Sequence, residues 1–370
     1  AERVELHDFT RESLASLMVG REVIFNLHKC EQTPGPEVLR LENVSALNNK
    51  NLPALRNVNL SLHEGEILGI AGVAGNGQSE LVEVITGLRP CSGQIWLGGK
   101  DIANKPPAFS IQQGLAHIPE DRIGVGTAPN LSITSNIIMK RYDQEPVSQK
   151  WQLDYVAADD VASGLKTEYD IQAPNVHTQV RKLTGGNLQK LILARELSSL
   201  PHLIVAMQPT RGLDVGAIEG VQQLLLNQRS QGCAILLVSE DLDELLSLSD
   251  RIAVMYEGEV AGVICSEDFD ITQIGLMMTG TTSQDLQTQK EKPSASNFDK
   301  VFKNLPQAEE PAQAGTTAMP ELPFESKTQA DELPQEGLTS PHDDPYQHLT
   351  EKERVLRKVL GDKYKQGDTE

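Results

Sequence analysis

The sequence predicts an α/β fold in which helices cover a largely parallel, buried sheet, and three observations support this. Short apolar runs alternate with helical patterns along much of the chain, as at 203–206 and 234–238. These runs are apolar throughout instead of at every second residue, which is typical of strands buried on both faces. A glycine-rich segment, Gly72–Ser79, joins another such run to a helical pattern. Strand, glycine-rich turn and helix in this order form the local context of a phosphate-binding loop.

Length, charge and cysteine content limit the remaining possibilities. The 370 residues suffice for two domains, or for one domain with tails. The net charge of −19 argues against a general nucleic-acid surface. The cysteines form no C-x-x-C pair, which indicates a reducing compartment without a disulfide or metal framework. No apolar stretch approaches the roughly 18 residues that span a bilayer. The start has no signal-peptide pattern and no methionine, which is consistent with a fragment.

The N-terminal 36 residues are too poor in apolar residues to form a domain. Thr10–Met18 resembles a capped amphipathic helix, and Gln32–Pro36 has the composition of a linker. An α/β domain is expected over 37–280. Its first expected strands are 38–44, 58–62, 67–71 and 93–97, with a helix from 80 to 85 after the glycine-rich segment.

The strand pattern is interrupted from about 127 to 182, where polar and helical sequence predicts a helical insertion. After it the alternation returns. The expected strands are 203–206, 234–238, 252–256 and 260–264, and the expected helices are 185–199, 216–228 and 242–248.

The last 90 residues differ in composition. Pro, Glu, Gln, Ser and Thr dominate 281–349, and so few apolar residues predict a disordered tail. Residues 350–370 include Val355, Leu356, Val359 and Leu360 at helical spacing among charged residues. Two interpretations stay open for this short helix: docking on a partner or membrane surface, or a frayed helix in solvent.

The glycine-rich segment follows the template G-x-x-x-x-G-K-[ST] at Gly72, Gly77 and Ser79. Glycines allow backbone N–H groups to converge on phosphate oxygens at a helix N-terminus. The lysine position holds Gln78, so the cation that would reach the β- and γ-phosphates is missing. A hydrogen bond to a charged group contributes roughly 1.5–3 kcal/mol, so weaker nucleotide binding is still expected. The alternative is a glycine-rich turn without a ligand.

A second glycine pair opens a long helical pattern at Thr184–Lys190. Thr184 is expected to cap the helix, while Gly185 and Gly186 would let another backbone approach the free N–H groups. A glycine C-cap is the alternative, but the helical pattern follows the glycines instead of preceding them.

Three further stretches carry polar residues at informative distances from the glycine-rich segment. The run 203–206 leads into Met207 and Gln208, where a nucleotide hydrolase would have an Mg²⁺-binding Asp and a catalytic Glu. The run 234–238 leads into Ser239–Leu242. The stretch His117–Arg122 has two interpretations, a functional loop or a charged loop held by a salt bridge.

Together these motifs resemble the ATP-binding cassette (ABC) family of P-loop NTPases over about 38–280. The match is closest to the second cassette of the double-cassette ATPases of simple-sugar and nucleoside importers. The segments that carry this resemblance are 118–122, 183–190 and 208–217, and Gln208 favours the nucleoside branch. Residues 8–23 are similar to the end of a preceding first cassette, most of which is absent.

The resemblance implies a role for each motif. Cassettes of this family pair head to tail, with ATP between the P-loop of one and the signature loop of the other. The expected nucleotide-binding residues are Gly72, Gly75, Asn76, Gly77, Gln78, Ser79 and Glu80, with Ser79 as a weak Mg²⁺ ligand. The signature loop offered to the partner would be Thr184, Gly185, Gly186, Asn187 and Gln189. Gln208 stands at the catalytic Glu position and Glu240 at the switch His position, while Glu120, Asp121 and Asp214 take coupling and D-loop positions.

These departures predict that the chain's own site binds ATP with slow or absent hydrolysis. No aromatic residue lies between Phe25 and Trp96 to stack on adenine. The expected cofactors are ATP and weakly held Mg²⁺. The expected partners are a first cassette, membrane permease subunits and, indirectly, a solute-binding protein, with no nucleic acid, at the cytoplasmic face of the plasma membrane. A soluble ABC protein outside transport and an inactive truncated relic are the alternatives.

Overall fold

The computed structural model describes residues 29, 32–149 and 152–281. These belong to one compact unit, 1–298, whereas a second unit, 299–370, lies outside the described residues. The predicted helix at Thr10–Met18, the similarity of 8–23 to a preceding cassette, and the predictions for the tail after Thr281 therefore concern residues that are not described.

The central sheet of the described domain has the strand order β12-β11-β3-β10-β9-β6. The strands are β3 (Ile67–Ala71), β6 (Leu115–Ile118), β9 (Leu203–Met207), β10 (Ala234–Val238), β11 (Arg251–Tyr256) and β12 (Glu259–Cys265). All neighbours pair in parallel except β12, which pairs antiparallel with β11 at the edge. The predicted parallel sheet is thus confirmed, and β6 is a strand that the sequence analysis missed.

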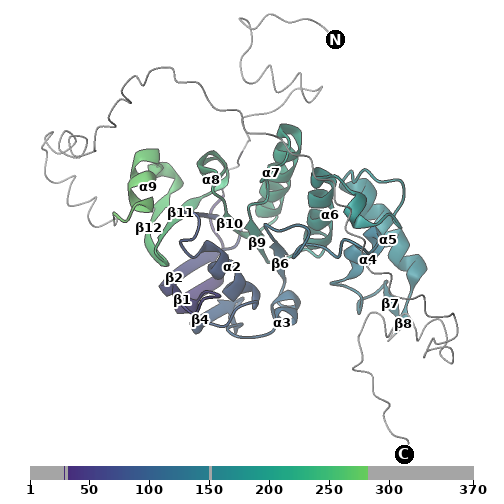
Figure 1. Ribbon diagram of the computed structural model, residues 1–370, viewed down its shortest axis with the longest axis horizontal. Helices are drawn as coiled ribbons and strands as arrows, with labels where there is room; N and C mark the ends of the chain where they lie inside the picture. Colours follow the sequence, from purple (N-terminus) through teal and green to yellow (C-terminus); the bar gives the residue numbers. More distant parts are fainter. Residues whose placement is uncertain (1–28, 30–31, 150–151, 282–370) are drawn as a thin grey trace, which may run out of the picture. The chain divides into compact units, whose positions relative to one another are not determined.

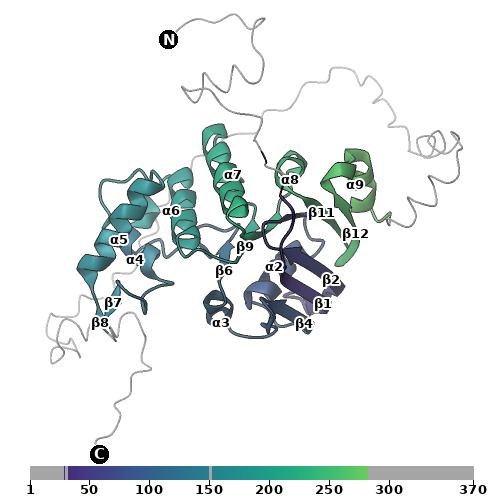
Figure 2. The same cartoon turned by 180° about the vertical axis from the view of Figure 1, so that it is seen from behind.

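Both faces of this sheet are buried, as the uniformly apolar strands predict. In β9, Leu203 and Val205 join one core cluster, while Ile204 and Ala206 join the other. One face is covered by α6, α7, α8 and α9, and the opposite face by α2, as Figures 1 and 2 show. The bounds of these helices are α2 (Gln78–Thr86), α6 (Gly185–Leu197), α7 (Val215–Ser230), α8 (Leu242–Leu248) and α9 (Ile271–Met278). Helix α9 was not predicted.

A second, antiparallel sheet with the order β2-β1-β4-β5 shares its core with α2. Its strands are β1 (Glu37–Leu47), β2 (Pro53–His63), β4 (Ser92–Leu97) and β5 (Lys100–Asp101), and α3 (Pro107–Gln112) follows. The expected strands at 38–44, 58–62 and 93–97 fall within β1, β2 and β4, although β1 and β2 extend further.

The insertion predicted at 127–182 packs its helices against α6 around a third core cluster. It contains α4 (Ile133–Ile138), α5 (Tyr155–Glu168) and the 3₁₀ turn η2 (Val180–Lys182). It also contains a small hairpin, β7 (Ser148–Gln149) with β8 (Gln152–Leu153), that the helical prediction did not include. Among the described helices, none combines the length and apolarity needed to cross a bilayer.

The parallel order positions the candidate site. Strands β3, β10 and β9 are adjacent and point the same way. Their carboxyl ends therefore meet at one edge of the sheet, where ligands of open α/β sheets bind. The loops that leave this edge are Gly72–Gly77 after β3, Gln208–Asp214 after β9 and Ser239–Asp241 after β10.

Candidate functional site

The glycine-rich segment forms a loop that leads from β3 into the first turn of α2. Gly77 is the N-cap of α2 with a φ of +100°, and a Cβ there would lie 2.5 Å from the Ala54 carbonyl oxygen. Both the left-handed backbone and the close carbonyl require glycine. At Gly75, no described atom lies within 4 Å of the position that a Cβ would take. The loop thus faces open space at a helix N-terminus, as a phosphate-binding loop requires.

The side chain of Gln78 lies across this loop at the position where the family template has lysine. Its Nε2 donates to the Val73 carbonyl oxygen at 3.1 Å, and only 8% of the residue is exposed. A Cβ on Gly72 would collide with the same Nε2, so the amide packs directly against the loop backbone. The loop is therefore held by a neutral donor, and position 78 offers no positive charge to a phosphate.

Asn76 ties the loop to the turn between β11 and β12. Its Oδ1 accepts from the Glu257 N–H at 3.1 Å, and its carbonyl oxygen accepts from the Gly258 N–H at 3.1 Å. This contact was not predicted, because nothing in the local sequence shows that the turn reaches the loop. Ser79 is exposed and Glu80 is half-buried on the first turn of α2.

Gln208 and Glu240 lie next to each other at the ends of β9 and β10. The Gln208 N–H donates to the Val238 carbonyl oxygen at 2.8 Å, and its Oε1 accepts from the Glu240 N–H at 3.4 Å. Gln208 has a φ of +49° and is buried, whereas Glu240 is exposed. A non-glycine residue in this backbone region carries strain of about 1–3 kcal/mol, a frequent feature of functional sites.

The residues at this edge fit nucleotide phosphates better than they fit a firmly held Mg²⁺. The loop offers backbone N–H groups at a helix start, which is the chemistry phosphate needs. For the metal, Met207 and Gln208 provide no carboxylate, so the Ser79 hydroxyl is the one expected ligand at this edge. Among the described residues, no group of three or more His, Cys, Asp or Glu could hold a metal ion.

The second glycine pair begins α6, as its order in the sequence predicts. Thr184 is the N-cap, and its Oγ1 accepts from the Asn187 N–H at 3.4 Å. Gly185 is exposed, and a Cβ added there would meet no described atom within 4 Å. The first turn of α6 thus has a capped start with an unobstructed surface beside it.

Two of the expected signature residues make contacts within their own chain. Asn187 is half-buried, and its Oδ1 accepts from the Gln172 N–H at 2.8 Å. Gln189 was expected to face the partner as part of the signature loop, but only 1% of the residue is exposed. Helix α6 packs Leu188 and Leu191 into the insertion and Ile192 into the central core, so the residues from Leu188 to Leu197 are buried except the half-buried Lys190. The outward-facing part is therefore Thr184–Asn187.

Asp214 lies close to this outward-facing segment. It caps α7 by accepting from the Ala217 N–H at 2.9 Å, and a Cβ on Gly186 would lie 4.0 Å from the Ala217 Cβ. The starts of α6 and α7 are thus adjacent, which brings the predicted D-loop residue next to the predicted signature loop.

The stretch His117–Arg122 contains a salt bridge, as its interpretation as a charged loop predicts. Glu120 pairs with Arg211 of the β9–α7 loop, and the Arg122 guanidinium donates to the Arg211 carbonyl oxygen. Asp121 accepts from the N–H groups of Ile123 at 3.0 Å and Gly124 at 2.8 Å. These contacts attach the loop after β6 to the loop that carries Gln208.

A buried charge network that the sequence analysis missed joins the insertion to the sheet. Glu196 is 2% exposed and pairs with Lys140 at 2.7 Å and with Arg195 at 2.8 Å. It also accepts from the His117 N–H at 3.1 Å. Lys140, Arg195 and His117 line a hollow of about 180 Å³. Burial, followed by the charge of Lys140, lowers the pKa of His117 to about 4.

This pKa predicts acid sensitivity. The folded chain binds a proton at His117 less readily than the unfolded chain does, so folding stability falls as the pH drops below 6.5. Between pH 7 and pH 5 the free energy of unfolding should fall by about 2 kcal/mol more in the wild type than in His117→Gln. Urea unfolding of both proteins at the two pH values measures this difference. Equal losses of unfolding free energy in the two proteins would contradict the lowered pKa of His117.

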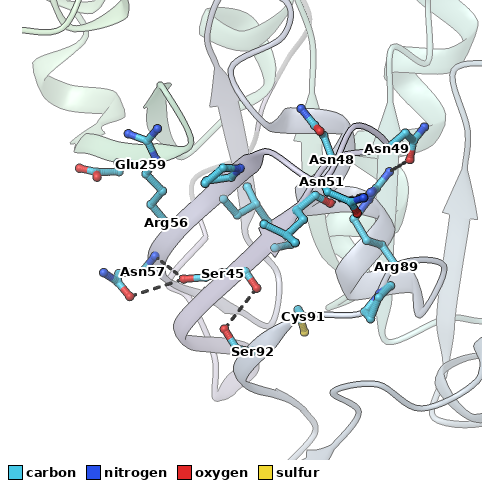
Figure 3. Close-up of a pocket in the computed structure, with 15 residues that line it drawn as sticks. Ser45, Asn48, Asn49, Asn51, Arg56, Asn57, Arg89, Cys91, Ser92 and Glu259 are labelled. Carbon is cyan, nitrogen blue, oxygen red and sulfur yellow. Dashed lines mark hydrogen bonds between the residues drawn. The ribbon is translucent and has the colours of Figure 1, made fainter.

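A hollow of about 900 Å³ lies at the end of the β1–β2 hairpin (Figure 3). Figure 3 shows Asn48, Asn49 and Asn51 gathered near Arg89, which donates to the Leu47 carbonyl oxygen at 2.7 Å and to Asn49 Oδ1 at 2.8 Å. None of the predicted nucleotide-binding or signature residues lines it. The hollow therefore lies apart from the site built by the sheet edge.

Comparison with known proteins agrees with this geometry. Residues 55–211 match the family model described as ABC transporter. The fold is similar to a dimeric ATP-binding cassette in a post-hydrolysis state bound to ADP and Pi, with a TM-score of 0.53 and 22% identity over 62% of this chain and 100% of that chain. The described domain therefore has the fold of an ABC cassette, an α/β fold of the P-loop NTPases.

Two curated relatives indicate the branch of the family. The chain is 47% identical over 280 residues to the glucose import ATP-binding protein TsgD13 of Haloferax volcanii, covering 75% of this chain and 51% of the relative. It is 43% identical over 283 residues to the guanosine import ATP-binding protein NupO of Bacillus subtilis, covering 76% and 56%. The chain is thus similar to ATP-binding proteins of sugar and nucleoside importers, and it spans about half the length of these relatives.

Proposed function

We propose that this chain is the second cassette of an ABC importer for nucleosides or simple sugars. Its role is to complete the nucleotide site of a first cassette, while its own site binds ATP weakly and hydrolyses it slowly or not at all. The relatives support the transport class, because their names refer to import of glucose and of guanosine.

The chemistry of the chain's own site supports weak ATP binding and slow hydrolysis there. Gln78 replaces the cation of the phosphate loop with an amide already bonded to Val73. At the ends of β9 and β10, Met207, Gln208 and Glu240 stand at the metal, catalytic and switch positions. ATP would be bound by backbone N–H groups and the hydroxyl of Ser79. Without a metal carboxylate or an oriented base, little stabilisation of the transition state is available.

The exposed start of α6 supports the proposed role in completing the nucleotide site of a first cassette. It is the observation on which the proposal mainly rests. Thr184 fixes the helix start, and Gly185 leaves its N–H groups open to a neighbouring molecule. Backbone N–H groups at a helix N-terminus bind phosphate through hydrogen bonds and the helix dipole. A partner's nucleotide would be held there, with Asp214 close by at the start of α7.

Closure of the two cassettes around ATP would shift the membrane permease subunits between two states. The permease, and through it a solute-binding protein, are therefore the proposed further partners, at the cytoplasmic face of the plasma membrane. Val125 is exposed and lines the hollow beside the Glu196 network. Together with the exposed Ile123, two residues earlier in the chain, it offers an apolar surface for the permease.

Two other functions remain as competing hypotheses. A soluble ABC protein outside transport would bind ribosomes or DNA, and an inactive relic would bind neither a permease nor a second cassette. Copurification with membrane permeases favours the importer over both. The DNA directly upstream would show whether a first cassette is encoded in frame.

The decisive experiment measures ATP hydrolysis by the purified chain alone and after addition of a first cassette from the same transporter. We expect little turnover by the chain alone and a large increase on mixing, beyond that of the first cassette by itself. Robust turnover by the chain alone would refute the proposed division of roles.

A further inference from the structure

A buried carboxyl group connects two of the loops at the sheet edge. Glu244, on the first turn of α8, is only 3% exposed. Its Oε1 accepts from the Thr210 hydroxyl at 2.8 Å. Thr210 belongs to the β9–α7 loop and is itself buried. This contact joins positions 34 residues apart.

Two more elements face the same carboxyl group. The Ser239 hydroxyl, at the end of β10, and the Gln222 amide, on α7, both act on it and lower its pKa. Burial raises that pKa more strongly, and the neighbouring charge of Asp241 raises it further. Among the described residues, no cation acts on it. A buried carboxyl group without a cation is costly for the fold, so its polar contacts are a feature to be explained.

The two connected loops are those that carry the expected catalytic positions. On one side, Gln208 Oε1 accepts from the N–H of the exposed Glu240 at 3.4 Å. On the other, Thr210 is bonded to the buried Glu244. Asp241 completes the arrangement, since its Oδ1 caps α8 by accepting from the Asp243 N–H at 3.0 Å and its own N–H donates to Ser239 Oγ at 3.1 Å.

We propose that Glu244 is a positioning residue that holds the Gln208–Asp214 loop against the Ser239–Asp241 loop, so that both loops move as one unit. The part of this inference that concerns turnover depends on the proposed function, in which Asp214 and its neighbours face a partner cassette. If the two loops move together, nucleotide binding at the chain's own site would shift the surface that completes the partner's nucleotide site.

Hydrogen exchange of the full chain alone tests the connection without a partner. Glu244→Leu and Thr210→Val each remove the buried hydrogen bond at nearly constant volume. Each variant should accelerate exchange in both segments, 208–214 and 239–241, by about tenfold, the factor expected from one buried hydrogen bond. Glu244→Gln keeps an oxygen acceptor and should leave both segments within about twofold of the wild type.

A matched control removes a hydroxyl elsewhere. Thr86 is buried on α2, and its hydroxyl donates to the Val82 carbonyl oxygen at 2.8 Å. Thr86→Val should leave exchange in both segments unchanged. Acceleration of only one segment, or of neither, in folded Glu244→Leu and Thr210→Val would overturn the proposal.

Turnover with a first cassette separates this inference from the proposed function. Glu244→Leu and Thr210→Val should lower kcat about tenfold with KM nearly unchanged, whereas Glu244→Gln should retain activity. If the wild type fails to stimulate the first cassette while the exchange result holds, the proposed function fails and the connection stands. If the wild type stimulates and the two variants do so equally well, the role of Glu244 in turnover is refuted.

Discussion

Replacing Gly185 by leucine should abolish stimulation of a partner cassette while leaving the fold of this chain intact. A Cβ at Gly185 meets no described atom within 4 Å, so the side chain enters solvent space in the isolated chain. In the assembly it would occupy the surface proposed to face the partner's phosphates. We expect ATP turnover of the mixed cassettes to fall by about a hundredfold or more, as on loss of preorganised donors.

Gly164→Leu is the matched control for this variant. Gly164 is also exposed on a helix, α5, and has no described atom within 4 Å of an added Cβ. Its replacement should leave stimulation unchanged. Both variants should unfold in urea within about 1 kcal/mol of the wild type, because neither site is crowded. Full activity of Gly185→Leu would show that the start of α6 does not face a nucleotide.

Replacing Gln78 by lysine should restore nucleotide affinity to the chain's own site. The lysine would release the Val73 carbonyl oxygen and bring a positive charge to the phosphate loop. A hydrogen bond to a charged group contributes roughly 1.5–3 kcal/mol, so ATP should bind about tenfold to a hundredfold more tightly. Calorimetric titration of the isolated chain with ATP measures the change. Hydrolysis should remain slow, because Met207 and Gln208 are unchanged.

Gln112→Lys provides the same gain of charge away from the loop. Gln112 is exposed at the end of α3, and its replacement should alter ATP affinity by less than about twofold, since solvent screens exposed charges. Equal affinity of wild type and Gln78→Lys would mean that the loop does not bind phosphate through this position.

Much of the fold was predictable because burial on both faces leaves a clear pattern. Strands β9 and β10 are apolar throughout, and their positions were predicted to within a residue. The short strand β6 was missed, since its Leu-Ala-His-Ile run is too short and too mixed to stand out beside α3. Helix α9 was missed although it places Ile274 and Met277 in the core.

The candidate site was predictable where a residue acts on its immediate neighbours. The cap at Thr184 and the turn at Gly77 depend on backbone groups a few positions away. Gln189 was placed wrongly, because its burial depends on the insertion and the sheet enclosing α6 from two sides. The contact of Asn76 with the β11–β12 turn was missed for a similar reason, since it spans 181 positions.

The sequence by itself determined which chemical groups this protein possesses: a glycine loop before a helix, a second capped helix start, and an amide where a phosphate loop has its cation. These features depend on residue type and on local dihedral preferences. The tertiary structure alone decided which groups meet. The order β11-β3-β10-β9 brings three loops to one edge and places Thr210 on Glu244. Strand order depends on the packing of the whole core, which no local pattern specifies.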